Sequence, residues 1–155
     1  MNILSAFRLV LVSFLLCVFN SCALPHQEST NETVESAEIP PDMATEQFIL
    51  IGTLKNRKSY DKYMTKEFAN YTGKYLLANK AEITTTYQDI SKYRYIMDYT
   101  VDTDFGSSSQ PGSSTYRYFI KDRKANKIYP QRLRSGYYPF EIRSYLKAIE
   151  AFRKK

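Results

Sequence analysis

The sequence predicts one α+β domain, in which an antiparallel sheet of about four strands carries two helices on one face. Apolar residues recur every three or four positions over residues 60–71 and 142–152, as they do in helices with one buried side. Residues 93–103 and 115–121 alternate apolar and polar side chains, the period of half-buried strands. Because these strands follow one another between the two helices, we expect the helices to be segregated on one face of the sheet.

The first half of this domain contains two further candidate strands. The apolar run 48–51 favours a short buried strand, and the first helix is expected to close at Gly73, which suits a left-handed C-terminal position. A second strand is expected over residues 74–78. Residues 80–90 stay open between helix and strand, because a run of threonines favours β structure while the apolar spacing fits a helix.

The second half is centred on the strand 93–103, the clearest in the sequence. Its odd-numbered side chains form the longer apolar row, so we expect them to pack against the last helix. Gly106–Ser114 is rich in Gly, Ser and Pro and predicts a mobile hairpin loop. After the strand 115–121, a polar turn containing Asn126, which tolerates a positive φ angle, leads to a last strand beginning at 128–129.

The last helix is expected to begin near Pro139, since proline suits the first turn of a helix. Its apolar stripe comprises Ile142, Tyr145, Leu146, Ile149 and Phe152. Basic residues at the end of the chain complement the negative end of the helix dipole.

Cys22 follows a short cationic start and the eleven-residue apolar stretch Leu9–Phe19, which is too short to cross a hydrocarbon core of about 30 Å. A small residue, Ser21, directly precedes it. This arrangement resembles the signal of a bacterial lipoprotein. The resemblance implies that residues 1–21 are a signal peptide and that Cys22 is lipidated, which labelling with palmitate would detect. It also implies that the mature protein is anchored in the cell envelope.

Cysteine usage agrees with lipidation at Cys22. The one other cysteine, Cys17, lies in the apolar stretch, so no disulfide framework is encoded in the rest of the chain. The membrane would be the outer membrane, and the anchored face periplasmic or external. The alternative is an ordinary secretory signal, because Ser21 and Ala23 form a small-x-small cleavage site. That alternative gives a secreted, soluble protein.

Charge divides the remainder of the chain into two parts. Residues 23–46 carry a net charge of −6 with no Lys or Arg, whereas residues 47–155 carry +11. The acidic part has no aromatic residue and little apolar area to offset its ordering entropy. We therefore expect residues 22–46 to be a lipidated cysteine followed by a disordered tether, and residues 47–155 to be a basic, Tyr-rich domain.

The residues of the domain exclude several kinds of chemistry. The chain's one histidine, His26, lies in the tether, and residues 47–155 contain no Cys, which leaves neither Cys–His nor Ser–His–Asp catalysis and no soft ligands for zinc or copper. No glycine-rich phosphate loop is present. We therefore expect no enzyme activity, no cofactor and no metal. An exported chain is also not expected to bind nucleic acid.

These observations predict a non-catalytic binding module, whose partner is an acidic protein or an anionic polymer of the envelope. The expected contact surface is a cluster of six cations around the last hairpin: Lys121, Arg123, Lys124, Lys127, Arg132 and Arg134. The alternative is a carrier of a small ligand or lipid, with a pocket between helix and sheet. A binding module should expose Tyr and Arg, whereas a carrier should hold its aromatic residues around a cavity.

Overall fold

The computed structural model describes residues 32–132 and 134–154. They form a six-stranded mixed sheet with three α-helices and a short 3-10 helix. The predicted α+β class is confirmed, whereas the expected four antiparallel strands and two helices differ from this arrangement. The elements are β1 (Thr33–Val34), η1 (Pro41–Ala44), β2 (Ile49–Leu54), α2 (Lys58–Phe68), β3 (Lys74–Asn79), α3 (Lys80–Thr85), β4 (Tyr95–Ser107), β5 (Gln110–Asp122), β6 (Lys127–Pro130) and α4 (Tyr138–Arg153). The predicted signal peptide and Cys22 lie outside the described residues.

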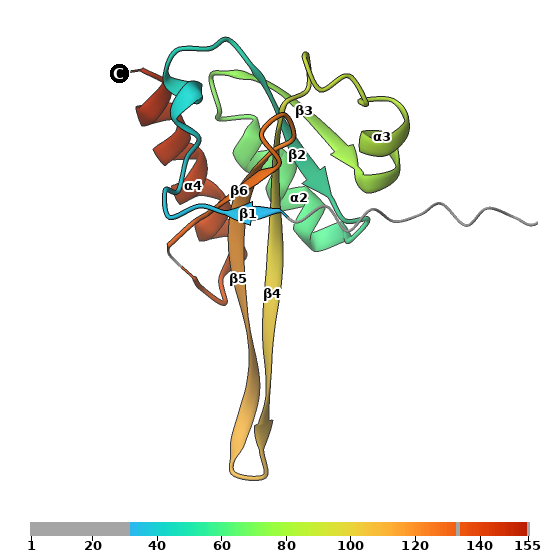
Figure 1. The fold of residues 1–155 in the computed structure, drawn as a ribbon. Coiled ribbons are helices and arrows are strands. Elements are labelled where there is room, and N and C mark those ends of the chain that lie inside the picture. The colour runs from blue at the N-terminus through green and yellow to red at the C-terminus, as the bar shows by residue number, and fades with distance from the viewer. Residues whose placement is uncertain (1–31, 133, 155) are drawn as a thin grey trace, which may run out of the picture. The chain divides into compact units, whose positions relative to one another are not determined.

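The strand order is β1-β6-β5-β4-β2-β3 (Figure 1). Strands β4, β5 and β6 pair antiparallel, as predicted, but β2 runs parallel to both of its neighbours and β1 runs parallel to β6. The sheet is mixed because α2 connects β2 to β3, and a helical crossover of this length returns the chain in the same direction. Asn126 has a φ angle of 53°, which confirms the predicted turn before β6.

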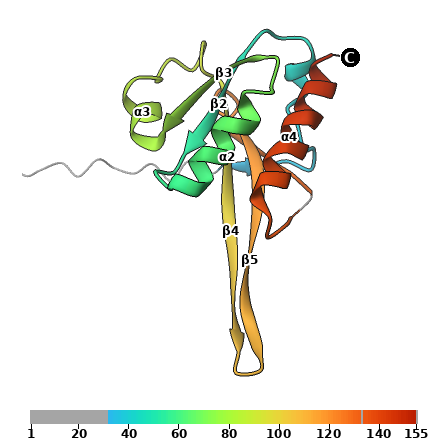
Figure 2. The ribbon, with the colours of Figure 1, turned by 180° about the vertical axis from the view of Figure 1, so that it is seen from behind.

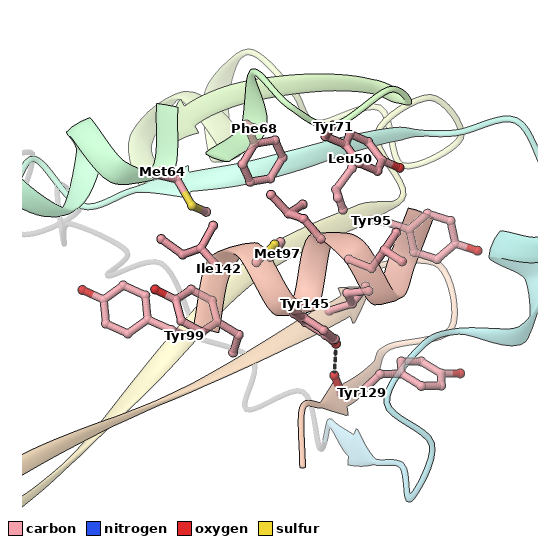
Figure 3. Close-up of a cluster of buried hydrophobic side chains, with 14 of the residues drawn as sticks. Leu50, Met64, Phe68, Tyr71, Tyr95, Met97, Tyr99, Tyr129, Ile142 and Tyr145 are labelled. Carbon is pink, nitrogen blue, oxygen red and sulfur yellow. Dashed lines mark hydrogen bonds between the residues drawn. The ribbon is translucent and has the colours of Figure 1, made fainter. Parts of the chain in front are cut away.

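Helices α2 and α4 cover one face of the sheet and enclose the main core (Figures 2 and 3). Ile142, Leu146 and Ile149 of α4 belong to one buried cluster with Met97 and Tyr99 of β4. The prediction that the odd-numbered side chains of this strand face the last helix is therefore confirmed. Figure 3 shows the Tyr145 ring at the base of this cluster, where its hydroxyl donates to the carbonyl oxygen of Tyr129 at 2.8 Å.

Helix α3 resolves the ambiguous stretch 80–90 as a short helix followed by turns. It begins at a capping box in which the Asn79 side chain accepts from the backbone N–H of Glu82 and the Glu82 carboxylate accepts from the backbone N–H of Asn79. Ile83 then packs with Ile51 and Ile96 in a smaller cluster on the opposite side of the sheet from α2 and α4. Two separate layers therefore cover parts of the two faces.

The acidic segment departs from the expected disordered tether over residues 32–46. Thr33–Val34 adds β1 to the edge of β6, and Met43 of η1 is fully buried in the main core. Its carboxylates also meet cations of the domain: Lys127 Nζ lies 2.7 Å from Glu35, and Arg94 lies 2.6 Å from Asp42. The segment's own apolar area is too small to offset its ordering entropy. Met43 is nevertheless buried, because the rest of the chain supplies the core in which it packs. Residues 22–31 of the expected tether lie outside the described residues.

The largest local departure from expectation is a long two-stranded arm made by β4 and β5, defined here as Thr100–Thr115. The expected mobile loop Gly106–Ser114 is instead mostly strand, and pairing continues to Ser107 and Gln110, which flank a two-residue turn. The Gly- and Ser-rich stretch forms strands instead of a loop because β4 and β5 hydrogen-bond to each other along it, and this pairing cannot be read from composition. Figure 1 shows the arm extending well beyond β2 and β6.

Candidate functional site

The six cations predicted to form one anionic-partner surface lie in four different settings, of which pairing with the acidic segment is the first. Lys121 pairs with Glu32, Lys127 with Glu35, and Arg132 Nε lies 3.9 Å from Glu38. The hydrogen bond from Lys127 to Glu35 raises the pKa of Lys127. The acidic segment thus partly neutralises this side of the domain.

Each of the remaining three cations lies in a different environment. Arg134 pairs with Asp102 of the arm at 3.0 Å. Arg123 is partly buried and its guanidinium donates to the backbone carbonyl oxygens of Tyr87 and Tyr93, at 2.6 and 3.0 Å. Lys124 is exposed in the turn before β6. The structure therefore does not present the six cations as one uninterrupted basic surface.

Tyrosine is mainly a core residue in this fold. Seven of the fourteen tyrosines are less than 9% exposed: Tyr60, Tyr71, Tyr95, Tyr99, Tyr118, Tyr129 and Tyr145. Their rings contact one another, as in the pair Tyr60–Tyr99, with centroids 4.6 Å apart. Burial raises the pKa of Tyr71 to about 12. The exposed Tyr surface expected of a binding module is thus limited to a few positions such as Tyr137, which is 63% exposed.

The arm is the most prominent exposed feature of the described residues. Val101 is 40% exposed and Phe105 is 91% exposed, on strands that are exposed over most of the arm. Strands β2 and β6 pair with β4 and β5 only outside the arm: β2 is in register with Tyr95–Met97 of β4, and β6 with Phe119–Asp122 of β5. Among the described residues, the strands of the arm pair only with each other from Thr100 to Thr115. An isolated bridge between Tyr116 and Ser135 lies next to the arm.

Hydrogen bonds at the base show which backbone groups of the arm point outward. The N–H of Tyr116 donates to Ser135, and the carbonyl of Tyr118 accepts from Gln131, so both groups face away from β4. Tyr99 is directly opposite Tyr118. In an antiparallel pair, when the backbone N–H and C=O of one residue face away from the partner strand, those of the residue opposite also face away. The N–H of Tyr99 accordingly donates to the Asp98 side chain at 2.7 Å. Residues 101, 103 and 105 therefore present their backbone groups to the outer edge of β4.

The two faces of β4 in the arm differ in chemistry. Asp102 and Asp104 lie on one face, and Val101 and Phe105 on the other, because side chains alternate along a strand. Residues 98–116 contain no Lys or Arg, whereas residues 47–155 as a whole carry a net charge of +11. The arm is thus an acidic, partly apolar element on a basic domain.

The arm was not predicted, because the Gly, Ser and Pro content of residues 106–114 is typical of a loop. One signal was available: the alternation of the strand 93–103 continues through Asp104 and Phe105. Two strands of equal length joined by two polar residues are typical of a tight hairpin.

Among residues 32–132 and 134–154, no group of three or more His, Cys, Asp or Glu side chains is placed to hold a metal ion. None of the helices in that part of the chain has the length and apolarity needed to cross a membrane. Comparison with protein-family models, with curated proteins and with solved structures finds no match.

Proposed function

We propose that this protein is a non-catalytic binding module, anchored to the cell envelope through Cys22, whose arm binds a partner protein by adding a strand to the outer edge of β4. The observation that carries this proposal is the outer edge of β4 from Thr100 to Ser107, which pairs with no other strand of residues 32–132 and 134–154. An exposed edge of this length offers a row of backbone donors and acceptors to an extended segment of another chain. The lipid anchor is supported by the leader sequence.

The chemistry of the arm defines the partner segment. A strand added beside β4 places its alternate side chains next to Asp102 and Asp104 on one face and next to Val101 and Phe105 on the other. The segment should therefore alternate cationic and apolar residues. Asp102 already pairs with the exposed Arg134, and a partner cation can replace this contact at little cost, since such pairs contribute about 1 kcal/mol or less.

The negative charge of the arm also disfavours self-association through this edge. Two copies pairing along β4 would bring Asp102 and Asp104 of one copy close to the same residues of the other. Like charges on adjacent strands are destabilising. The arm is therefore suited to a different protein rather than to a second copy of this chain.

The test uses the full-length protein and a synthetic acetylated peptide of alternating Lys and Val, with an alternating Glu and Val peptide as the charge control. Fluorescence anisotropy should show saturable binding of the Lys peptide, weakened by salt, and much weaker binding of the Glu peptide. Phe105→Ser should weaken binding. No binding of the Lys peptide, or equal binding of both peptides, would contradict the proposal.

Two matched proline variants test whether the partner binds the outer edge of β4 or that of β5. Thr103→Pro removes an outward N–H from β4, and Ser114→Pro makes the same change directly opposite, on β5. Thr103→Pro should reduce affinity at least about tenfold, while Ser114→Pro should retain binding, since only the first removes a ladder hydrogen bond to the partner. The reverse result, or equal loss in both variants, would show that the outer edge of β4 is not the binding site.

The partner predicted from the sequence, an acidic protein or anionic polymer, is a second proposal that now depends on the most exposed cations. The Arg132 side chain is 81% exposed with its ion pair at 3.9 Å, and Lys124 is also exposed. Replacing both by Gln should reduce binding to polyglutamate at low salt, whereas Gln at Lys58 and Lys62 of α2 should not. Equal retention of both double variants would contradict a role for this basic turn.

A further inference from the structure

A pocket of about 380 Å³ lies on the side of the sheet that α3 covers, away from the arm's outer edge and from the main core. Its apolar lining comprises Ile83 of α3, Ile96 of β4 and Phe119 of β5. This volume is within the range of small-molecule sites, and an apolar floor with a few polar groups is their usual composition.

Thr53 lines the pocket, and its hydroxyl group is the first feature that suits a ligand. Thr53 is 2% exposed, and its hydroxyl oxygen has no hydrogen-bond partner among the described residues. Burying a hydroxyl without a partner is unfavourable, and buried polar groups in proteins are nearly always paired. A ligand oxygen in the pocket would accept the missing hydrogen bond.

Cations lie at both ends of the apolar floor. Lys55, which follows β2, and Lys80, which begins α3, lie at the end beside Thr53, where Asp98 pairs with Lys55. One cation is therefore in excess at this end. An anionic group placed there would meet both a positive charge and the unpaired hydroxyl.

The second end is formed by β5. Lys121 pairs with Glu32, and the Arg123 guanidinium is held by backbone carbonyls, so one cation is again in excess. Burial lowers the pKa of Arg123, and the nearby charge of Asp89 only partly opposes this effect. A second anionic group at this end would compensate a charge that is partly removed from water.

The spacing of the two ends follows from the sheet. Strands β2 and β5 are separated only by β4, so their backbones lie roughly 10 Å apart. The register places Lys121 opposite Ile96 and Phe119 opposite Asp98, so Ile96 and Asp98 of β4 lie between the two ends, and Phe119 lies on β5 on the same face as Lys121. The pocket therefore has cations at both ends and the apolar side chains of Ile96 and Phe119 along its floor, and Lys55 pairs with its one central carboxylate, Asp98.

We propose that this pocket binds a small linear dicarboxylate. One carboxylate accepts a hydrogen bond from Thr53 beside Lys55, the other pairs with Lys121, and the apolar chain between them lies on Ile96 and Phe119. The Glu32 carboxylate, which pairs with Lys121 in the structure, occupies the position of the second carboxylate and is displaced by the ligand.

The test titrates the full-length protein by calorimetry with suberate, with hexanoate as a monoanion and with 1,8-octanediol as a neutral molecule of similar length. Suberate should bind at least about tenfold more tightly than hexanoate, because a charge-assisted contact is present at each end, and the diol should bind least. No binding of suberate at millimolar concentration, or equal binding of the three molecules, would overturn the proposal.

Three variants then test the assigned contacts. Thr53→Val keeps the side-chain shape but removes the hydroxyl and should weaken suberate binding at least about fivefold. Glu32→Gln removes the internal competitor and should strengthen binding several-fold, whereas Lys62→Gln on α2 should leave it unchanged. Unchanged affinity in both Thr53→Val and Glu32→Gln would overturn the proposal. Thr103→Pro separates the two sites, because it should weaken Lys-peptide binding at least about tenfold and leave suberate binding intact.

Discussion

The Arg94 guanidinium holds the Asp122 carboxylate through two parallel hydrogen bonds, from Nε to Oδ1 at 2.9 Å and from Nη2 to Oδ2 at 2.7 Å. Asp122 ends β5, and its side chain is 2% exposed. Arg94, which directly precedes β4, also reaches Asp42 and Glu46 of the acidic segment. One arginine thus joins the end of the β4–β5 ladder that is farthest from the arm to the acidic segment.

Replacing Arg94 by Met should destabilise the protein by about 3 kcal/mol or more, because it leaves the buried carboxylate of Asp122 without its cation. Urea unfolding followed by circular dichroism measures the change. The control is Arg134→Met, which breaks an exposed ion pair and should change the free energy of unfolding by about 1 kcal/mol or less. Equal effects of the two variants would show that the Arg94 contact is not a buried anchor.

Acid should destabilise the fold through its paired carboxylates. Burial alone would raise the pKa of Asp122, but hydrogen bonds from Arg94 and from backbone N–H groups outweigh it and lower this pKa. For Glu150, burial is likewise outweighed by Lys154, Thr72 and Arg153, and the pKa falls from 4.5 to about 2. A lowered folded-state pKa adds stability above the unfolded-state value, and that stability disappears as pH falls through the folded-state value.

The free energy of unfolding should therefore decrease as pH is lowered from about 4.5 to about 2. Urea titrations at several pH values measure this slope. Asp122→Asn should be less stable at pH 7 and should show a smaller loss on acidification, since one of the contributing carboxylates is gone. A variant slope equal to that of the wild type would contradict the assigned role of Asp122.

Leu146→Ala should destabilise the protein by about 2–5 kcal/mol, because it removes a buried side chain of α4 and leaves a cavity over β4. Thermal or urea unfolding measures this loss. Lys147→Ala, at the next and exposed position of the same helix, should change stability by less than about 0.5 kcal/mol. A loss below about 0.5 kcal/mol for Leu146→Ala would mean that α4 does not pack on the sheet as described.

Gly52→Ala should also be destabilising, by about 1–3 kcal/mol, although it adds only one methyl group. A Cβ atom at Gly52 would lie 2.7 Å from the Phe68 ring and 2.8 Å from the Leu77 side chain, both in the packed layer between β2, β3 and α2. Gly136→Ala meets only the Ser114 carbonyl oxygen, at 3.3 Å, and should cost less. An equal or smaller effect at Gly52 than at Gly136 would show that the core yields at this point.

Lipidation is tested by metabolic labelling with palmitate in a bacterial host. Label should enter the wild type and the Cys17→Ala variant, and it should be absent from Cys22→Ala, which lacks the thiol at the predicted acylation site. Cell fractionation should place only the labelled proteins in the membrane. Label that persists in Cys22→Ala would reject the lipoprotein assignment, and an unlabelled, soluble wild type would favour the secretory alternative.

Local patterns were sufficient for much of the architecture. The period of apolar residues in α4 and the alternation along β4 predicted both elements and the face by which they meet, because burial on one side imposes these periods on the sequence. Asn126 likewise indicated its turn, since few residue types accept a positive φ angle.

Contacts between distant segments decided the remainder. Met43 is buried, and Arg94 pairs with its three carboxylates, only when residues far apart in the chain come together. The arm is ordered because β4 and β5 hydrogen-bond to each other, which no count of Gly and Ser reveals. The pocket beside Thr53 also combines residues of four separate elements. By itself, the sequence determined the periodic elements and the leader pattern, whereas pairing energy between remote segments determined the edge of β4, the docked acidic segment and the pocket.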